Sequence, residues 1–266
     1  MGMTMKFKIA LLLFVFSCSA FAVEVNDVNT LTPATGIFMQ DARVFPKTAW
    51  GDAQKTYFNN NNLLLLLLAG GGSIALHDSR GDNTVAEHFD RHEGMPQDLD
   101  KFTDLAGNPG THFAATGIWY WIASSRKDDI NVQRSWIMMR ALAVTGATTL
   151  ALKGIVRNDT PNGKDWAWPS GHTASSFCVA SVLDEFYGPK IGIPAYLAAG
   201  FVGYRMMDSG DHWASDVLFG GVLGYVVGHT VAGDNKELQL AGFRIQPLVS
   251  TFWDRPAAGI AFAKEF

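Results

Sequence analysis

The stretch "DWAWPSGHTASSF" (residues 165–177) decides the fold, because it combines a turn with the start of a helix. Ser170 stands where a helix N-cap is expected, and the apolar run that follows ends at Gly188-Pro189. Gly171 has no Cβ, so its backbone can approach a ligand closely. The first turn of a helix attracts anions, which predicts an anion site with the titratable His172 beside it. Taken alone, the segment also fits a plain capped helix with a surface histidine.

A second motif, "LKGIVRNDTP" (residues 152–161), lies just before this turn. Lys153 and Arg157 are four residues apart, so they share one face near the end of a helix. Two cations on one face favour a bound anion between them. The alternative is a solvated basic face that pairs with Asp159 or Asp165.

A third motif, "YRMMDSGDHWASDV" (residues 204–217), follows one helix later. Arg205 can offer a bidentate guanidinium to phosphate oxygens. His212 and Asp216 are four residues apart, so the carboxylate can fix the imidazole tautomer and leave the other ring nitrogen as a nucleophile. A capping histidine with a neighbouring carboxylate is the alternative for this motif alone.

Together, in this order, the three motifs resemble the signature of the phosphatidic acid phosphatase type 2 and vanadium haloperoxidase superfamily. That signature reads K-x6-R-P, then P-S-G-H, then S-R-x5-H-x3-D. The P-S-G-H and H-x3-D parts match as written, and the resemblance extends over residues 111–232. Three departures stand out: Thr160 replaces the first arginine, Tyr204 replaces the serine, and six residues instead of five separate Arg205 from His212.

The resemblance implies a metal-independent phosphatase without a cofactor, working through a phosphohistidine. His212 is then the nucleophile, Asp216 orients it, and His172 is the general acid and base. The implied phosphate-binding residues are Lys153, Arg157, Thr160, Ser170, Gly171 and Arg205. Arg157 is expected to compensate for the arginine missing at position 160, because it lies one helical turn before Thr160.

The pattern of apolar residues predicts an all-α helical bundle. The expected helices cover residues 63–76, 111–124, 132–156, 173–186, 194–206 and 212–231, and a small hairpin is expected in the C-terminal tail at residues 233–266. Residues 111–232 are interpreted as the phosphatase core, and residues 23–110 as an N-terminal extension with the first helices packed on the bundle. Within that extension, residues 23–60 show no clear period, and residues 77–112 resemble a long loop with one short helix.

The N-terminal residues 1–22 are typical of a signal peptide, with a basic start, a short apolar centre and an A-x-A end. This predicts an exported, periplasmic protein. Cleavage would leave Cys178 as the one cysteine and make the formal charge more negative than −4, which argues against nucleic acid as a partner. The apolar stretches are short or interrupted, for example by Arg140, and favour a soluble bundle. Six leucines at residues 63–68 keep membrane association open.

The expected partner is a phosphate ester, soluble or lipid, with a membrane surface as a further partner in the lipid case. Two other functions stay open: a non-catalytic protein that binds phosphate or a lipid headgroup, and a vanadate-dependent haloperoxidase. Thr160 and the lengthened third motif favour the first of these, while nothing in the sequence marks a halide site.

Overall fold

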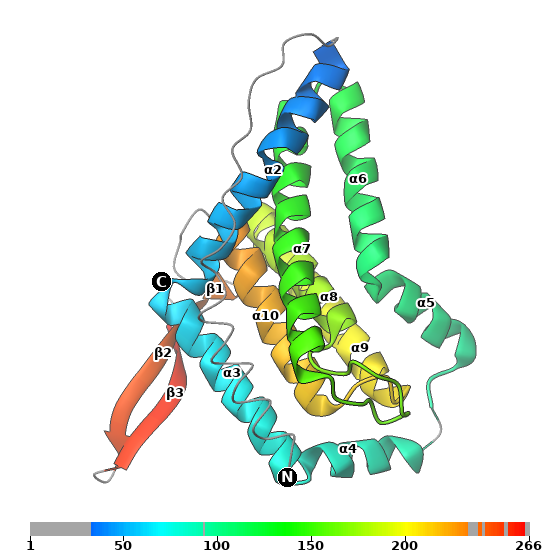
Figure 1. Cartoon of the computed structure of the whole chain (residues 1–266), viewed down its shortest axis with the longest axis vertical. Coiled ribbons are helices and arrows are strands. Elements are labelled where there is room, and N and C mark those ends of the chain that lie inside the picture. The colour runs from blue at the N-terminus through cyan, green and yellow to red at the C-terminus, as the bar shows by residue number, and fades with distance from the viewer. Residues whose placement is uncertain (1–32, 93, 234–238, 241–242, 253–254, 264–266) are drawn as a thin grey trace.

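Helix α10 (Ala214–Ala232) lies in the middle of a helical bundle and contacts α2, α3, α7, α8 and α9 (Figure 1). The computed structural model describes residues 33–92, 94–233, 239–240, 243–252 and 255–263. The remaining helices are α2 (Pro33–Tyr57), α3 (Asn60–Asp78), α4 (Gly81–Asp90), α5 (Gln97–Gly107), α6 (Pro109–Ser125), α7 (Asp129–Val156), α8 (Gly171–Tyr187) and α9 (Pro189–Asp208). The predicted all-α class is confirmed. The predicted signal peptide lies outside the described residues.

The closest helix packing, between α8 and α10, depends on three glycines at a spacing of four residues. A Cβ on Gly224 would lie 2.0 Å from the carbonyl oxygen of Ala174, and Cβ atoms on Gly220 and Gly228 would each lie 2.6 Å from a carbonyl oxygen of α8 or its N-cap. No side chain fits at these distances. The glycines therefore let the two backbones touch, which brings the first and third sequence motifs together.

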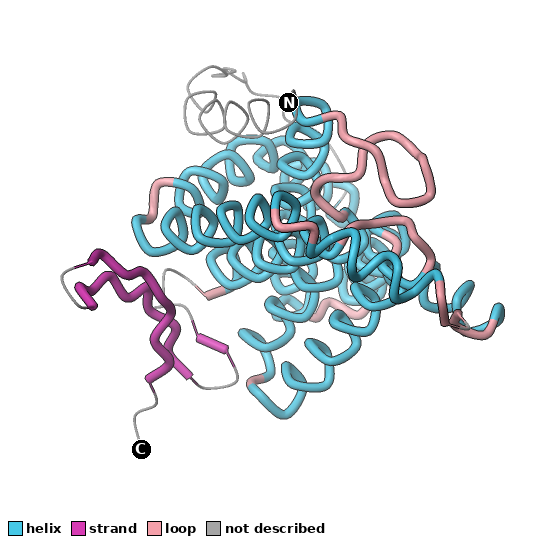
Figure 2. Tube along the Cα trace, turned by 90° about the horizontal axis from the view of Figure 1, so that it is seen from below, coloured by secondary structure: helices cyan, strands magenta, loops and turns pink. Residues whose placement is uncertain are grey.

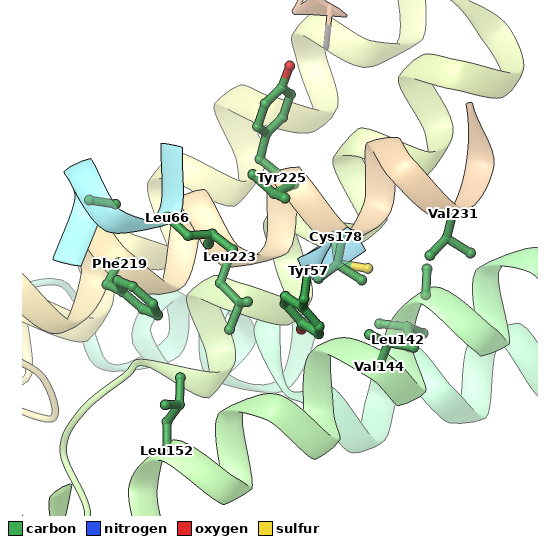
Figure 3. Packing of buried hydrophobic residues seen from close by; sticks show 14 of the residues in the cluster. Tyr57, Leu66, Leu142, Val144, Leu152, Cys178, Phe219, Leu223, Tyr225 and Val231 are labelled. Atoms are coloured by element: carbon green, nitrogen blue, oxygen red, sulfur yellow. The ribbon is translucent and has the colours of Figure 1, made fainter. Parts of the chain in front are cut away.

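The hydrophobic core surrounds α10 and includes side chains from distant parts of the chain (Figure 3). Leu223 of α10, Leu142 and Leu152 of α7, and Cys178 of α8 are almost completely buried. Leu66 of α3 packs into the same cluster. Because α2, α3, α7 and α8 bury apolar side chains against α10, this packing fixes the helix ends that carry the sequence motifs.

The N-terminal third is more helical than the sequence predicts. Helix α2 occupies residues 33–57, where no period was apparent, and it continues through Pro46. Helix α3 runs through the three glycines 70–72, which were expected to end it or to act as a hinge. Helices α4 and α5 replace most of the loop expected at residues 77–112. Further along, Pro189 instead of Pro194 occupies the first turn of α9, and Pro194 lies inside that helix.

The C-terminal hairpin is confirmed. Strand β2 (Phe243–Phe252) pairs antiparallel with β3 (Arg255–Ala263), and the short β1 (Gln239–Leu240) pairs with the other edge of β2. Figure 2 shows the strands to one side of the helical body. Among the helices, α3 contacts β2.

Within the part of the chain that the structure describes, two helices are long and apolar enough to cross a membrane: α7 with 28 residues and α10 with 19. The bent pair of α3 and α4 provides a third such span if it is taken as one. These helices are longer than the interrupted stretches expected from the sequence. Arg140 lies inside α7, and its guanidinium pairs with Asp52 of α2 at 3.3 Å, so its charge is not left unpaired among the apolar side chains.

Candidate active site

The start of α8 is joined directly to the start of α10. Ser170 is the N-cap of α8, as predicted, and its Oγ accepts a hydrogen bond from the backbone N–H of Thr173 at 3.4 Å. The backbone N–H of Ser170 donates to the carbonyl oxygen of Asp216 at 3.1 Å. Gly171 is the first residue of α8, where backbone N–H groups point out of the helix. The P-S-G-H and H-x3-D motifs therefore meet at one end of the bundle.

His212 and Asp216 form the pair that their spacing predicts. Nδ1 of His212 lies 3.3 Å from Oδ2 of Asp216, and the same oxygen accepts the backbone N–H of Trp213 at 2.9 Å. Both side chains are buried. Since Nδ1 faces the carboxylate, Nε2 is the ring nitrogen available for chemistry.

Arg205 is buried and contacts three carboxylates. Its Nε and Nη2 donate to the two oxygens of Asp100 at 2.6 and 3.3 Å. Its Nη1 donates to Asp104 and to Asp211, both at 2.9 Å. Two of these carboxylates come from α5, a segment to which the sequence analysis assigned no function. The guanidinium thus occupies the expected place but is bound to side chains of the protein itself.

His172 lies close to this cluster. Its Nε2 is 3.4 Å from Oδ1 of Asp104, the same oxygen that accepts from Arg205. His172 lies at the first turn of α8, outside the helices that qualify as membrane spans. Burial lowers the pKa of His172, the Asp104 carboxylate opposes this effect, and the nearby His212 and Arg205 side chains lower the pKa further. These interactions place both histidines and Arg205 in one electrostatic cluster.

Lys153 reaches the same end of the bundle from α7. Its Nζ donates to the carbonyl oxygens of Trp166 and Ala167, the latter at 2.9 Å, and its charge interacts with Asp216. The lysine therefore ties the loop before α8 to the end of α7. It also adds a positive charge near the His212–Asp216 pair.

Arg157 and Thr160, two of the expected phosphate-binding residues, make no contact within the described residues to His172, Arg205 or His212. Arg157 is exposed, ends α7 in a left-handed conformation, and donates from Nε to the carbonyl oxygen of Gly154 at 2.8 Å. The hydroxyl of Thr160 bonds within its own turn, to Asn162 and Lys164. The compensation expected from Arg157 therefore stays a prediction.

Lys164 is a cation that the sequence analysis missed. Its Nζ lies 2.7 Å from Asp211 Oδ1, while the other oxygen of Asp211 binds Arg205. Burial raises the pKa of Asp211, but hydrogen bonds from Lys164, Ser209 and Asn162 outweigh burial and lower that pKa to about 2. Asp211 therefore stays ionised and links Lys164 to Arg205. The one signal for Asp211 in the sequence is that it lies between Arg205 and His212, in a segment one residue longer than the family signature.

A buried polar network behind the site was also missed. Asp82 of α4 accepts the backbone N–H of Ser215 at 2.9 Å and the Ser215 hydroxyl at 2.6 Å, which caps the start of α10. The hydroxyl of Ser73 donates to the Ser215 carbonyl and accepts the indole N–H of Trp168. Residues of α3 and α4 therefore hold the helix end that carries His212 and Asp216. Asp82 has no motif in sequence, because its role depends on a partner far along the chain.

Comparison with known proteins agrees with the sequence motifs. Residues 134–237 match the profile of the PAP2 superfamily, which confirms the resemblance. A lipid A 1-phosphatase from Porphyromonas gingivalis is 40% identical over 65 residues, which are 23% of this chain and 15% of that protein. The chain thus aligns with only a small part of that relative.

The fold comparison extends further. The crystal structure of a transmembrane PAP2-type phosphatidylglycerolphosphate phosphatase from Bacillus subtilis matches with a TM-score of 0.56 and 18% identity. The match covers 67% of this chain and 99% of that chain. The two proteins therefore share the helical fold.

Proposed function

We propose that this protein is a phosphatase that hydrolyses phosphate monoesters or diphosphates of lipids at a membrane surface. The observation that carries the proposal is the cluster in which His212, oriented by Asp216, lies in the electrostatic range of His172 and Arg205. A histidine nucleophile, a second histidine and a buried arginine are the groups that phosphoryl transfer to an imidazole needs. The names of both similar proteins, each a phosphatase of a lipid, support the substrate class.

In the first step, Nε2 of His212 attacks phosphorus in line with the leaving oxygen. The N–P bond forms as the P–O bond to the leaving group breaks, and His172 donates its proton to that oxygen. Asp216 accepts the Nδ1 proton of His212 in a hydrogen bond at 3.3 Å and so stabilises the positive charge of the phosphorylated ring. Before substrate binds, Asp104 opposes the effect of burial on the pKa of His172 and so increases the protonated fraction of the free protein.

In the second step, water attacks the phosphohistidine. His172 removes a proton from the water, the N–P bond breaks, and inorganic phosphate leaves. Arg205, Lys153 and the first turn of α8 at Ser170 and Gly171 are the groups proposed to hold the non-reacting phosphate oxygens. Arg157 and Thr160 are proposed as further contacts to the phosphate. They can reach it only if the turn after α7 moves.

A metal-free route is part of the proposal. The described residues contain no group of three or more His, Cys, Asp and Glu side chains that could hold a metal ion. His212 supplies the nucleophile and Arg205 the positive charge, so we expect full turnover in the presence of a chelator. Inhibition by vanadate is expected as well, because vanadate adopts the five-coordinate geometry of the transition state.

The deciding experiment compares the wild-type protein with His212→Ala and with Arg126→Ala, an arginine at the far end of α6. Reconstituted protein is assayed with phosphatidic acid, with a polyprenyl diphosphate and with a soluble aryl phosphate. Labelled phosphate is trapped on the protein by a quench in alkaline detergent, which preserves the acid-labile N–P bond of a phosphohistidine. We expect His212→Ala to lose both turnover and trapped label, while Arg126→Ala keeps both. Turnover or labelling of His212→Ala near the wild-type rate would refute the nucleophile. Similar rates on all three esters would argue against lipid specificity.

Phosphate binding without turnover is the second candidate. Thr160 uses its hydroxyl within its own turn, and Arg205 is bound by carboxylates, so fewer cations face the site than the family signature implies. Tight binding of inorganic phosphate with no hydrolysis of any of the three esters would establish this function instead.

A further inference from the structure

Helix α5 has its polar and apolar faces the wrong way round for a helix that packs on a core. The face turned towards α8 and α9 carries Asp100, Thr103, Asp104 and Gly107, which are buried or half-buried. The opposite side of the helix carries Leu99, Phe102 and Leu105, which are 42%, 67% and 63% exposed. We call these three residues the outer apolar face. Hydrophobic burial therefore contributes little to holding α5 in place.

The acidic face of α5 is held mainly by Arg205. Asp100 binds the guanidinium through both carboxylate oxygens, and Asp104 binds Nη1. Carboxylate and phosphate oxygens fit the same guanidinium donors. The two aspartates therefore occupy donors of Arg205 that a phosphate group would use.

Asp104 also reaches the proposed general acid. Its Oδ1 lies 2.9 Å from Nη1 of Arg205 and 3.4 Å from Nε2 of His172. One carboxylate oxygen thus stands between the arginine and the histidine, where the proposed function requires a phosphate oxygen or a leaving oxygen. A bound phosphate and the acidic face of α5 compete for this position.

Further contacts hold the two ends of α5. Gly107 packs so tightly on Val202 of α9 that a Cβ would lie 2.5 Å from a Val202 methyl carbon, and its carbonyl accepts from Ser175 at 3.3 Å. On the N-terminal side, the backbone N–H of Met95 donates to Asp208 at 2.9 Å. The C-terminal end is therefore a fixed point about which the rest of α5 can turn, once Arg205 releases its partners.

The helices that contact α5 expose large apolar side chains as well. Helix α5 contacts α6 and α9, and both expose large apolar side chains: Ile118 and Trp121 on α6, Leu197 and Phe201 on α9. Soluble monomers seldom expose so many large apolar side chains on adjacent elements. Helices α7 and α10 of the same bundle are long and apolar enough to cross a membrane. A lipid surface is the partner that fits these exposed apolar side chains.

We propose that α5 is a lid over the active site. In the closed state described here, Asp100 and Asp104 hold the anion site. When the outer apolar face docks on a lipid surface, α5 turns about its Gly107 end and withdraws both carboxylates from Arg205 and His172. Phosphate binding and lipid docking then favour the same open state, so each strengthens the other. The lid rests on the proposed function, because it controls access to that same site.

The first test follows the position of the lid and requires no turnover. A bimane label is attached to Phe102→Cys in the full chain carrying Cys18→Ser, since Cys178 is completely buried. The labelled protein is placed in nanodiscs whose lipids carry bromine on the acyl chains. We expect bromine to quench the label, and inorganic phosphate to increase the quenching at least twofold. The double variant D100N/D104N should show the increased quenching without phosphate.

The matched control is a label at Asn83→Cys, an exposed polar position on α4. Its fluorescence should not respond to phosphate. The lid is refuted if phosphate fails to bind, or if it binds without changing the quenching at position 102. It is also refuted if the double variant binds phosphate more tightly while its label stays unquenched, since removing charge alone would then explain the affinity.

The second test is functional and uses the outer apolar face. The triple variant L99S/F102S/L105S should lose at least tenfold in turnover of a lipid phosphate in nanodiscs, while its turnover of a soluble aryl phosphate in micelles stays unchanged. Phe58→Ser, at an apolar position 62% exposed outside α5, serves as the control and should lose neither activity. Equal losses on both substrates would contradict the lid. If no variant and not even the wild type hydrolyses any ester, the proposed function fails, while the fluorescence test still decides the lid.

Discussion

At the scale of single residues, Asp104 connects the electrostatics of the site to its chemistry. Its carboxylate contacts Arg205 and His172 at once, and it supports the protonated form of the histidine against burial. Because burial dominates, the pKa of His172 lies below its ordinary value of 6.5. A general acid must carry its proton, so activity should fall as the pH rises through this lowered pKa.

Asp104→Asn tests this relation. Without the carboxylate, the pKa of His172 should fall further, and the basic limb of the kcat/KM profile should move to lower pH. Asp98→Asn, an exposed residue of the same helix, should leave the profile unchanged. The measurement is kcat/KM of a soluble aryl phosphate from pH 4 to pH 9. A basic limb that stays in place or moves upward would show that His172 is not the general acid.

Asp82 is a positioning residue with a different signature. Asp82→Asn places an amide NH2 against either the N–H or the hydroxyl of Ser215, which leaves a buried donor unpaired at a cost of about 1–3 kcal/mol. We expect kcat to fall about tenfold or more with KM nearly unchanged, because the start of α10 shifts while the anion site stays. Asp90→Asn on the same helix is the exposed control. A rise in KM alone would mean that Asp82 acts on binding instead of on the nucleophile.

At the scale of elements, the sequence predicted the helices with strong end signals. Ser170 and Gly188 mark the ends of α8, and the structure uses both as caps. Helices α2 and α5 were missed for physical reasons. The segment of α2 shows no clear apolar period in sequence. Helix α5 places aspartates inward and leucines outward, so its pattern does not resemble a helix packed on a core. Its inward face is explained by one arginine in α9, a partner that periodicity cannot reveal.

The glycine contacts between α8 and α10 give a prediction for this pair of helices. Gly224→Ala would place a Cβ 2.0 Å from the Ala174 carbonyl oxygen, so the helices must separate. We expect a loss of at least about 2–3 kcal/mol in stability, comparable to strong overpacking. Gly200→Ala is the matched control, because a Cβ there meets nothing within 4 Å, and it should stabilise α9 by about 0.5–1 kcal/mol. Thermal unfolding followed by circular dichroism measures both, and equal midpoints would contradict the close packing.

At the scale of the whole molecule, the site could be predicted only in part. His172, Arg205, His212 and Asp216 follow from short spacings, and the structure places them together. Two of the three carboxylates that bind Arg205 come from α5, about a hundred residues earlier in the chain, and no local pattern indicates that contact. The sequence analysis also favoured a soluble bundle, since it counted Arg140 as an interruption. In the fold, Asp52 neutralises that charge and α7 continues.

The packing of the helices also predicts that the protein is anchored in a membrane. This prediction can be tested on membranes from cells that produce the protein. Helix α10 is largely surrounded by other helices, whereas about half of the apolar window of α7 is buried within the protein. The exposed apolar side chains of α6 and α9 add to this apolar surface, and exposing so much of it to water would be unfavourable. We expect the protein to sediment with membranes, to resist extraction by alkaline carbonate, and to dissolve in mild detergent. The triple variant L99S/F102S/L105S should still sediment, because the bundle and not the lid anchors the protein. Release of the wild-type protein by carbonate would instead indicate a soluble bundle that meets lipid only through α5.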